Sequence, residues 1–316
     1  MTSAGSRGFL LVATGAALWG SGGIAGAFAA KYSSLSWPAI SSARLLLAGL
    51  LMLVLTAITG DLRRVQLTRE SVRRIVATGV ATAIYATAYF QSLPVVGVAV
   101  APVVSLGPAP VAVAVYAASR DWRVPGRSTV LALVAALTGL VLVSNPTTPA
   151  ADHRWFGLGL GLALLSGLAF AASTVVNQRV VPGLNPRTII ATSLTLAGLG
   201  SAPLGILTGA DFTTVTAPAW AAIGFLVVFQ TVIAYLAYFG GLQAGLPATT
   251  AVLVLLIEPL TATLLALLIL HEQLTVPVLL GMVLLMLAVV LVRPGRRSRV
   301  HGRRNRDSRP AREKSG

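Results

Sequence analysis

The chain has no cysteine, few acidic residues and little charge of either sign. Without thiols, disulfide bonds and thiolate metal sites are excluded, and three histidines without ligand-like spacing give no reason to expect a metal or another cofactor. Only 10% of the residues are charged, whereas soluble domains carry about 25%. Because 55% of the residues are hydrophobic and the mean hydropathy is +0.82, the composition indicates an all-α integral membrane protein.

Apolar runs of near-spanning length alternate with short polar breaks along most of the chain. A helix rises 1.5 Å per residue, so about 20 residues cross a hydrocarbon layer of about 30 Å. The pattern predicts ten transmembrane helices: Gly8–Ala30, Trp37–Ile58, Ile75–Leu93, Val96–Ser119, Ser128–Ser144, Phe156–Val176, Thr188–Leu207, Ala219–Gly241, Ala248–Leu270 and Val276–Val292.

Basic residues set the predicted orientation. If the N-terminus is cytoplasmic, all but three of the 24 Lys and Arg residues fall in segments on the cytoplasmic side; the exceptions are Lys31, Arg44 and Arg154. Cytoplasmic loops carry an excess of Lys and Arg, so both termini are expected in the cytoplasm. The basic segment 293–316 is then a disordered cytoplasmic tail that contacts anionic lipid headgroups. It has no aromatic residues to stack on bases, so nucleic acid is not expected as a partner.

The two halves of the chain repeat at an offset of 149 residues, which predicts two five-helix repeats at 8–144 and 156–292. Because five is odd, the second repeat must enter the membrane from the opposite side, as in inverted-repeat transporters. The matching pairs are Ala48-Gly49 with Ala197-Gly198, Ala88-Tyr89-Phe90 with Ala237-Tyr238-Phe239, Leu93 with Leu242, and Pro110 with Pro259.

One carboxylate, Glu258, lies in the middle of an otherwise apolar run and is followed at once by Pro259. A charge at the centre of a bilayer costs about 3 kcal/mol, so it needs a partner, a proton or water. Proline removes a backbone donor, which a membrane tolerates only where neighbours or water satisfy the freed carbonyl. Pro108 and Pro110 mirror this disturbance in the first half, so one interrupted helix from each half is expected at the centre.

Depth along the predicted helices brings Trp19, Tyr85, Gln230 and Glu258 to the midplane. Tryptophan and tyrosine usually occupy the membrane interface, so two of them at the centre favour a cavity with an aromatic wall. Ordinary bundle packing, with Gln230 bonded across helices, explains the same residues. Both interpretations stay open.

Arg44 lies about 10 Å deep, at a depth similar to that of Glu258. This permits a direct or water-bridged ion pair, which either holds the two halves in register or opens when a substrate or proton competes for one member. Gly157 and Gly161 form a small-xxx-small face that predicts close helix packing.

Several motifs in this order resemble the EamA-type transporters of the drug/metabolite transporter superfamily. They are Trp19-Gly20-Ser21, Arg44 after Pro38, Tyr89-Phe90, and Glu258-Pro259 followed by His271-Glu272-Gln273-Leu274. The resemblance implies a ten-helix inverted-repeat carrier in a prokaryotic plasma membrane, often exporting amino acids or related metabolites. It maps Trp19, Arg44 and Glu258 onto recurrent family positions. The family more often has glycine at the position of His271, and the first half has Ala109 in place of Glu258.

The sequence therefore predicts a secondary transporter, and not an enzyme, that exports amino acids, related amphipathic solutes or drugs by alternating access. A lipid or lipid-linked-sugar flippase and a non-transporting membrane scaffold are the alternatives. One acid at depth does not supply an intramembrane hydrolase. Glu258 is the candidate for proton coupling or amine binding and, with Pro110 and Pro259, for gating. The predicted substrate-binding residues are Trp19, Ser21, Arg44, Tyr85, Tyr89, Gln230 and Glu258.

Overall fold

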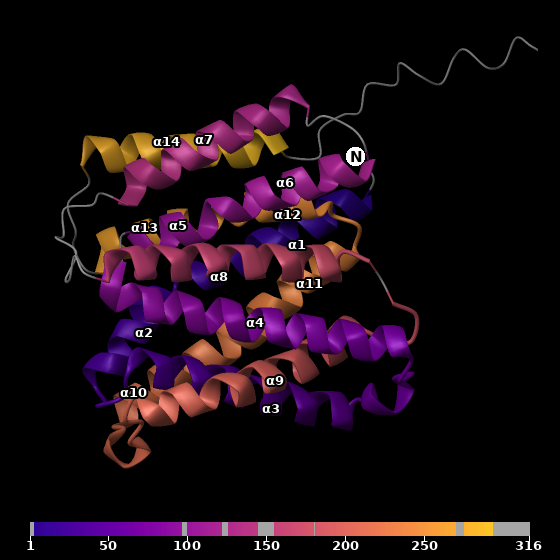
Figure 1. Cartoon of the computed structure of the whole chain (residues 1–316), viewed down its shortest axis with the longest axis vertical. Helices are drawn as coiled ribbons and strands as arrows, with labels where there is room; N and C mark the ends of the chain where they lie inside the picture. Colours follow the sequence, from indigo (N-terminus) through magenta and orange to yellow (C-terminus); the bar gives the residue numbers. More distant parts are fainter. Residues whose placement is uncertain are drawn as a thin grey trace, which may run out of the picture.

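The computed structural model describes residues 3–96, 100–121, 126–144, 155–179, 181–269 and 275–292. Within these ranges the chain is a bundle of helices, and its β pairing is one isolated bridge between Val181 and Leu184 (Figure 1). The first half comprises α1 (Ser3–Gly20), α2 (Gly22–Lys31), α3 (Trp37–Ile58), η1 (Leu62–Arg64), α4 (Arg69–Val96), α5 (Val100–Leu106), α6 (Pro108–Asp121) and α7 (Arg127–Ser144).

The second half of the chain is also built from helices. It comprises α8 (Phe156–Asn177), α9 (Pro186–Leu207), η2 (Phe212–Thr214), α10 (Ala217–Phe225), the π-helix η3 (Leu226–Ile233), α11 (Ala234–Gln243), α12 (Ala248–Val254), α13 (Ile257–Ile269) and α14 (Val276–Val292).

Six stretches of the described chain are long and apolar enough to cross a membrane, which makes the protein a multi-pass membrane protein. Shorter apolar helices lie at 104–119, 127–143 and 276–291, and α4 is long but mixes polar with apolar side chains. The six stretches are Gly5–Lys31, Trp37–Ile58, Phe156–Asn177, Pro186–Leu207, Ala217–Gln243 and Ala248–Ile269.

Two details of the expected helices are wrong. The third helix begins at Arg69 instead of Ile75, because the Thr68 hydroxyl accepts a hydrogen bond from the Ser71 backbone N–H at 3.1 Å and caps the longer helix. Gly157 and Gly161 do not form a packing face, since a Cβ atom at either position would meet nothing within 4 Å. Gly159, which lies between them, packs against Val95 and Val96 instead.

The most extensive contacts pair α3 with α9, α4 with α8, α7 with α14 and α1 with α11 (Figure 1). At the α3–α9 crossing, the absence of side chains on Gly49 and Gly198 lets the two backbones touch. A Cβ atom on Gly198 would lie 2.5 Å from the Leu46 Cα atom, and one on Gly49 would collide with the Thr195 backbone. The two helices therefore cross at matching positions of the two halves.

The helices that carry the prolines are interrupted in both halves, in agreement with the sequence-based expectation. Gly107 separates α5 from α6, and Leu255 with Leu256 separates α12 from α13. Pro110 and Pro259 then lie in the first turn of the second segment, where a helix leaves its N–H groups unpaired in any case. Interruption therefore removes the main cost of a buried proline.

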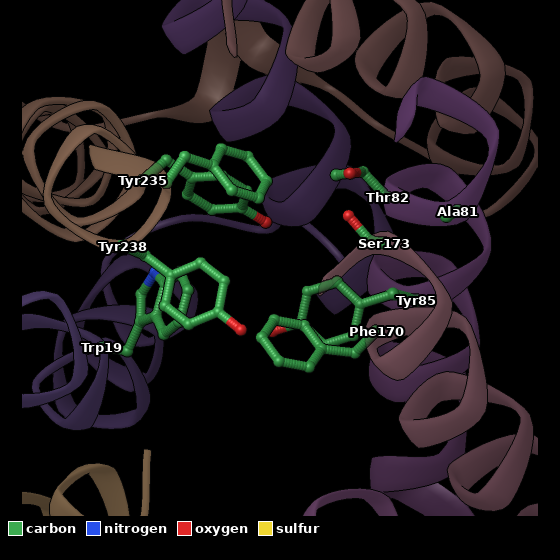
Figure 2. A pocket seen from close by; sticks show the side chains of 9 residues that line it. Trp19, Ala81, Thr82, Tyr85, Phe170, Ser173, Tyr235 and Tyr238 are labelled. Atoms are coloured by element: carbon green, nitrogen blue, oxygen red, sulfur yellow. The ribbon is translucent and has the colours of Figure 1, made fainter. Parts of the chain in front are cut away.

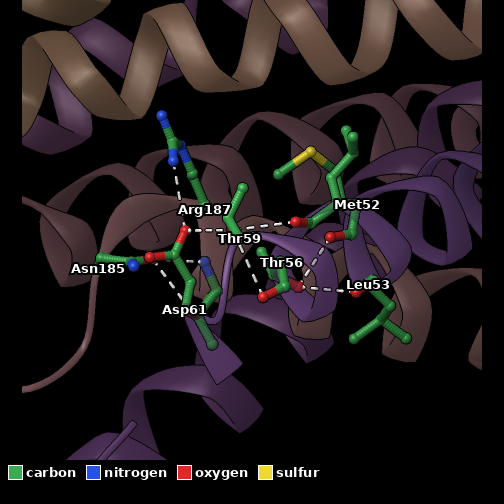
Figure 3. A network of polar contacts seen from close by, with 9 residues as sticks. Met52, Leu53, Thr56, Thr59, Asp61, Asn185 and Arg187 are labelled. Carbon is green, nitrogen blue, oxygen red and sulfur yellow. Dashed lines mark hydrogen bonds and ion pairs between the residues drawn. The ribbon is translucent and has the colours of Figure 1, made fainter. Parts of the chain in front are cut away.

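The helices α3 and α9 end in the same way. A threonine is followed by a glycine in the left-handed region, Gly60 with φ 72° and Gly209 with φ 83°, and then by a short 3₁₀ helix. After α3, Asp61 accepts a hydrogen bond from Thr59 at 2.9 Å and forms an ion pair with Arg187 of α9 at 3.3 Å (Figure 3). We call this end of the bundle the arginine end.

The opposite end of the α3–α9 pair is joined by hydroxyl groups, and we call it the hydroxyl end. Ser36 and Thr208 share a hydrogen bond of 2.7 Å, and Ser34 shares one of 2.5 Å with Thr214. Asp211, which follows α9 much as Asp61 follows α3, accepts instead from its own neighbour Thr213 at 2.6 Å.

Candidate functional site

Aromatic rings from α1, α4, α8 and α11 converge on a small cavity in the interior of the bundle (Figure 2). The ring centroid of Trp19 lies 5.2 Å from that of Tyr235 and 5.3 Å from that of Tyr238. Phe170 bridges the cluster to Tyr85, with ring centroids 5.3 Å apart. The lining residues are Trp19, Ala81, Thr82, Tyr85, Phe170, Ser173, Tyr235, Tyr238 and Phe239.

The cavity is very small. Its free volume is about 10 Å³, room for about one water molecule. Two hydroxyl groups, those of Thr82 and Ser173, lie at its edge, and the Tyr238 hydroxyl shares a hydrogen bond of 2.7 Å with Thr174. The wall is therefore apolar and aromatic, with a few polar groups that can orient a bound molecule.

Arg44 is buried in α3 and points to the second half of the chain. Its Nη1 donates to the Oε1 atom of Gln230 at 2.5 Å, and its Cζ atom lies 5.4 Å above the centroid of the Phe90 ring. The Arg44 Nε–H is buried with no hydrogen-bond partner. A buried guanidinium donor without a partner is costly, so this side chain is prepared to bind a further acceptor.

Gln230 reaches Arg44 from a π-helix. In η3 the Thr231 hydroxyl donates to the Leu226 carbonyl, five residues back, at 2.8 Å. π-Helical turns are rare and occur frequently at functional sites. The wider turn of a π-helix changes which residues share a face, so the direction of the Gln230 side chain differs from that expected on a regular α-helix.

Glu258 is the second residue of α13, directly after the break in its helix. The side chain is half-buried, and its carboxylate makes no hydrogen bond or ion pair with the rest of the described chain. The direct ion pair with Arg44 that similar depth permits is not formed; the Arg44 Nη1 atom donates to Gln230 instead. Arg44 is nevertheless near enough to act on Glu258 electrostatically.

Three tyrosines lie within the electrostatic reach of both charged groups: Tyr85, Tyr89 and Tyr235. Tyr89 also packs edge-on against Phe90, with ring centroids 5.7 Å apart, which places it beside the Arg44 guanidinium. Tyr85 and Tyr235 also line the aromatic cavity, so Arg44 and Glu258 lie near its wall.

The break between α1 and α2 lies against this region. The Ser21 hydroxyl donates to the Leu18 carbonyl at 2.6 Å, so it stabilises the break and does not face a neighbouring helix. A Cβ atom on Gly20 would lie 2.5 Å from the Glu258 carbonyl oxygen, and one on Gly22 would lie 2.8 Å from the Gln230 Nε2 atom. Only glycine allows this approach, so the two glycines position Glu258 and Gln230.

The chain is similar in sequence to known proteins. Residues 157–293 match the EamA-like transporter family. The uncharacterized transporter YwfM of Bacillus subtilis is 28% identical over 289 residues, which cover 90% of this chain and 92% of YwfM. The uncharacterized inner membrane transporter YicL of Salmonella typhimurium is 26% identical over 291 residues, which cover 90% of this chain and 95% of YicL. The second half of the chain thus matches an EamA-like transporter domain, and both relatives are named as transporters.

A solved crystal structure has the same fold, with a TM-score of 0.75 at 17% sequence identity, over 90% of this transporter and 96% of the solved chain. The protein is therefore a transporter and not an enzyme, and its substrate is a small molecule. In the described part of the transporter, no group of three or more His, Asp or Glu residues could hold a metal ion. His271 and the basic tail lie outside the described residues.

Sequence reasoning missed four rings of this transporter's aromatic wall: Phe170, Tyr235, Tyr238 and Phe239. Tyr238 and Phe239 were visible as part of the repeated Ala-Tyr-Phe block, and Phe170 lies well inside a predicted helix. Tyr235 lies outside the repeated block and gave no such signal.

Proposed function

We propose that this protein is an EamA-type transporter and a secondary active exporter of small amphipathic metabolites, with amino acids as the leading class. The observation that carries the proposal is a buried arginine with an unpartnered Nε–H near a carboxylate without a partner, beside an aromatic wall. An amino acid presents a carboxylate to Arg44, an amine to Glu258, and its side chain to the rings of Trp19, Tyr85 and Tyr235.

Alternating access is the mechanism that we propose. A cavity of about 10 Å³ cannot hold an amino acid, so the described conformation is contracted and the helices must move to admit a substrate. The interrupted helices ending at Gly107 and at Leu255-Leu256 supply places where such movement costs few backbone hydrogen bonds. Pro110 and Pro259, in the first turn after each break, limit how these segments can rejoin.

The pattern of helix contacts supports two inverted five-helix repeats, at 8–144 and 156–292. In sequence order α1 corresponds to α8, α3 to α9, α4 to α11 and α7 to α14. The α1–α11 contact therefore has its counterpart in the α4–α8 contact, and in the α3–α9 and α7–α14 pairs a helix packs on its own counterpart. The glycines at the α3–α9 crossing obey the same exchange, because Gly49 meets Thr195 and Gly198 meets Leu46 at the common offset of 149. Two such halves can expose one site to either side of a membrane.

We place the transporter in the plasma membrane of a prokaryote with the arginine end and both termini in the cytoplasm, since basic residues gather at that end. Glu258 is the group that couples export to a proton or receives the substrate amine. A midplane carboxylate without a partner in the described chain suits either role.

The test is transport by purified protein in sealed vesicles, after a thermal-shift screen of amino acids, amines, nucleosides and antimicrobials has identified a ligand. Glu258→Gln and Arg44→Gln should each lower the transport rate by about tenfold or more, since losing one charge-assisted contact costs about 1.5–3 kcal/mol. Glu70→Gln is the matched control, because Glu70 lies in the first turn of α4. Collapse of the proton gradient should stop uphill transport.

Unchanged transport by both site variants would remove Glu258 and Arg44 from the mechanism. Translocation of a fluorescent lipid that the same two variants abolish, without transport of any soluble compound, would replace the solute exporter with a flippase.

A further inference from the structure

We propose that a groove at the arginine end binds the headgroup of an anionic phospholipid. The groove has a volume of about 450 Å³ and lies between α1, α9 and α11, outside the aromatic cavity. Its lining residues are Arg7, Asn185, Pro186, Arg187, Leu236 and Gly240.

The groove carries positive charge that the described chain neutralises only in part. Arg7 is exposed and makes no hydrogen bond or ion pair with the described residues, and the Arg187 side chain is 58% exposed. Arg187 uses its Nη1 atom for Asp61, at 3.3 Å, which leaves other donors of its guanidinium for a second anion. Arginine binds phosphate through two parallel N–H groups, so two arginines in one groove suit a phosphodiester.

The position of the groove favours a lipid over a soluble anion. Arg7 and Arg187 lie at the first turns of the membrane-spanning stretches Gly5–Lys31 and Pro186–Leu207, and Gly240 lies near the end of Ala217–Gln243. These chain ends are at the height where lipid headgroups meet the hydrocarbon layer. Leu236 and Gly240 give the groove an apolar side along which an acyl chain can lie.

The repeat shows that this charge is not needed to build the fold. At the offset of 149 residues, Arg187 corresponds to Pro38 and Arg7 corresponds to Phe156. The corresponding positions at the hydroxyl end therefore have neither arginine, although α8 packs on α4 there much as α1 packs on α11. Among the described residues these two arginines lie at one end, as expected if the ligand is the anionic lipid of one leaflet.

The experiment measures lipid binding to the purified full chain in a neutral detergent, by native mass spectrometry and thermal unfolding. The probes are phosphatidylglycerol, phosphatidylcholine and glycerol phosphate. Phosphatidylglycerol should bind more tightly than phosphatidylcholine and raise the Tm. Arg7→Gln and Arg187→Gln should each weaken it about fivefold, the factor that corresponds to ~1 kcal/mol for each basic residue.

Two further variants separate the groove from its neighbours. Arg63→Gln removes the same charge from the exposed face of the 3₁₀ helix η1 at the same end, and it should leave phosphatidylglycerol binding unchanged. Asp61→Asn breaks the ion pair but keeps Arg187, so binding should be retained or tightened. Arg7 has no partner in the described chain, so Arg7→Gln tests the groove without removing a structural contact.

Three results would overturn the proposal. They are equal binding of phosphatidylcholine, equal losses in Arg63→Gln and Arg7→Gln, and glycerol phosphate binding as tightly as phosphatidylglycerol. The last result would assign the groove to a soluble anion. Failure of the proposed exporter leaves this test intact, since no groove variant alters Arg44 or Glu258.

Discussion

The two ends of the α3–α9 pair are built from the same local structure and joined by different chemistry. Both helices end in a threonine and a left-handed glycine, and a 3₁₀ helix and an aspartate follow. At the arginine end Asp61 reaches across to Arg187, whereas at the hydroxyl end Asp211 turns back to Thr213 and serine-threonine pairs make the connection. The two ends thus share their backbone structure, while the side-chain contacts that join them differ.

The difference has a physical consequence for how the ends respond to their surroundings. An ion pair with a side chain 58% exposed weakens as salt rises, because counterions screen the two charges. Hydroxyl pairs carry no net charge and are insensitive to salt. High salt should therefore weaken the ion pair at the arginine end and leave the hydrogen bonds at the hydroxyl end unchanged.

The largest effect is expected from a substitution that disrupts the α3–α9 crossing, which lies between the two ends. Gly198→Val puts side-chain atoms where a Cβ atom already lies 2.5 Å from the Leu46 Cα atom. We expect a loss of about 3 kcal/mol or more, or failure to fold, because backbone cannot yield as a side chain can. Thermal unfolding in detergent measures the loss. Gly157→Val is the control, since nothing lies within 4 Å of its Cβ position, and equal losses would contradict the crossing.

A smaller effect distinguishes the ends by salt. Asp61→Asn should lower the Tm at low ionic strength, because it removes the ion pair with Arg187. The deficit should shrink toward zero near 1 M salt, where the screening length is about 3 Å. Thr208→Val, which removes the hydroxyl partner of Ser36, should show a deficit that salt does not change. A salt-independent deficit in Asp61→Asn would show that the hydrogen bond from Thr59 dominates instead.

Acid should affect both aspartates. The hydrogen bond from the Thr59 hydroxyl, together with Arg187, holds the pKa of Asp61 below its ordinary value of 3.8, and the Thr213 hydroxyl and backbone N–H lower the pKa of Asp211. A depressed folded pKa stabilises the protein above the unfolded value, and this stability is lost as the pH falls through the folded pKa. The Tm differences between the parent and Asp61→Asn or Asp211→Asn should therefore shrink as the pH falls below 3.8 and vanish below the lowered folded pKa of each aspartate. Differences that persist in acid would contradict the ionised state of the carboxylates.

The smallest expected effect is at the tip of the hydroxyl end. Ser34→Ala removes one exposed hydrogen bond to Thr214 and should cost about 0.5 kcal/mol. Chemical denaturation, compared with the parent protein, measures a change of this size. A loss of unfolding free energy as large as that of Gly198→Val would show that the Ser34–Thr214 pair alone holds the hydroxyl end together.

Much of the fold was readable in the order of apolar segments and in the repeat. The bounds of α14 agree with the prediction, and the proline-based interruptions occur where Pro110 and Pro259 indicated. The start of α4 was missed, since Arg69 and Arg73 read as a polar loop although Thr68 caps a helix there. The glycines that pack were misread as well, because a small-residue spacing does not tell which face meets a neighbour.

The sequence by itself determined that Glu258 lies in an apolar helix beside a proline, that Arg44 lies at a similar depth, and that the basic residues favour one side. These properties follow from composition and from the fixed rise of a helix. Only the tertiary structure decided that Arg44 donates to Gln230 and that the Glu258 carboxylate has no partner in the described part of the chain. The reason is that this contact joins helices far apart in the chain, and that Gln230 lies in the π-helix η3, a geometry that α-helical periodicity does not show.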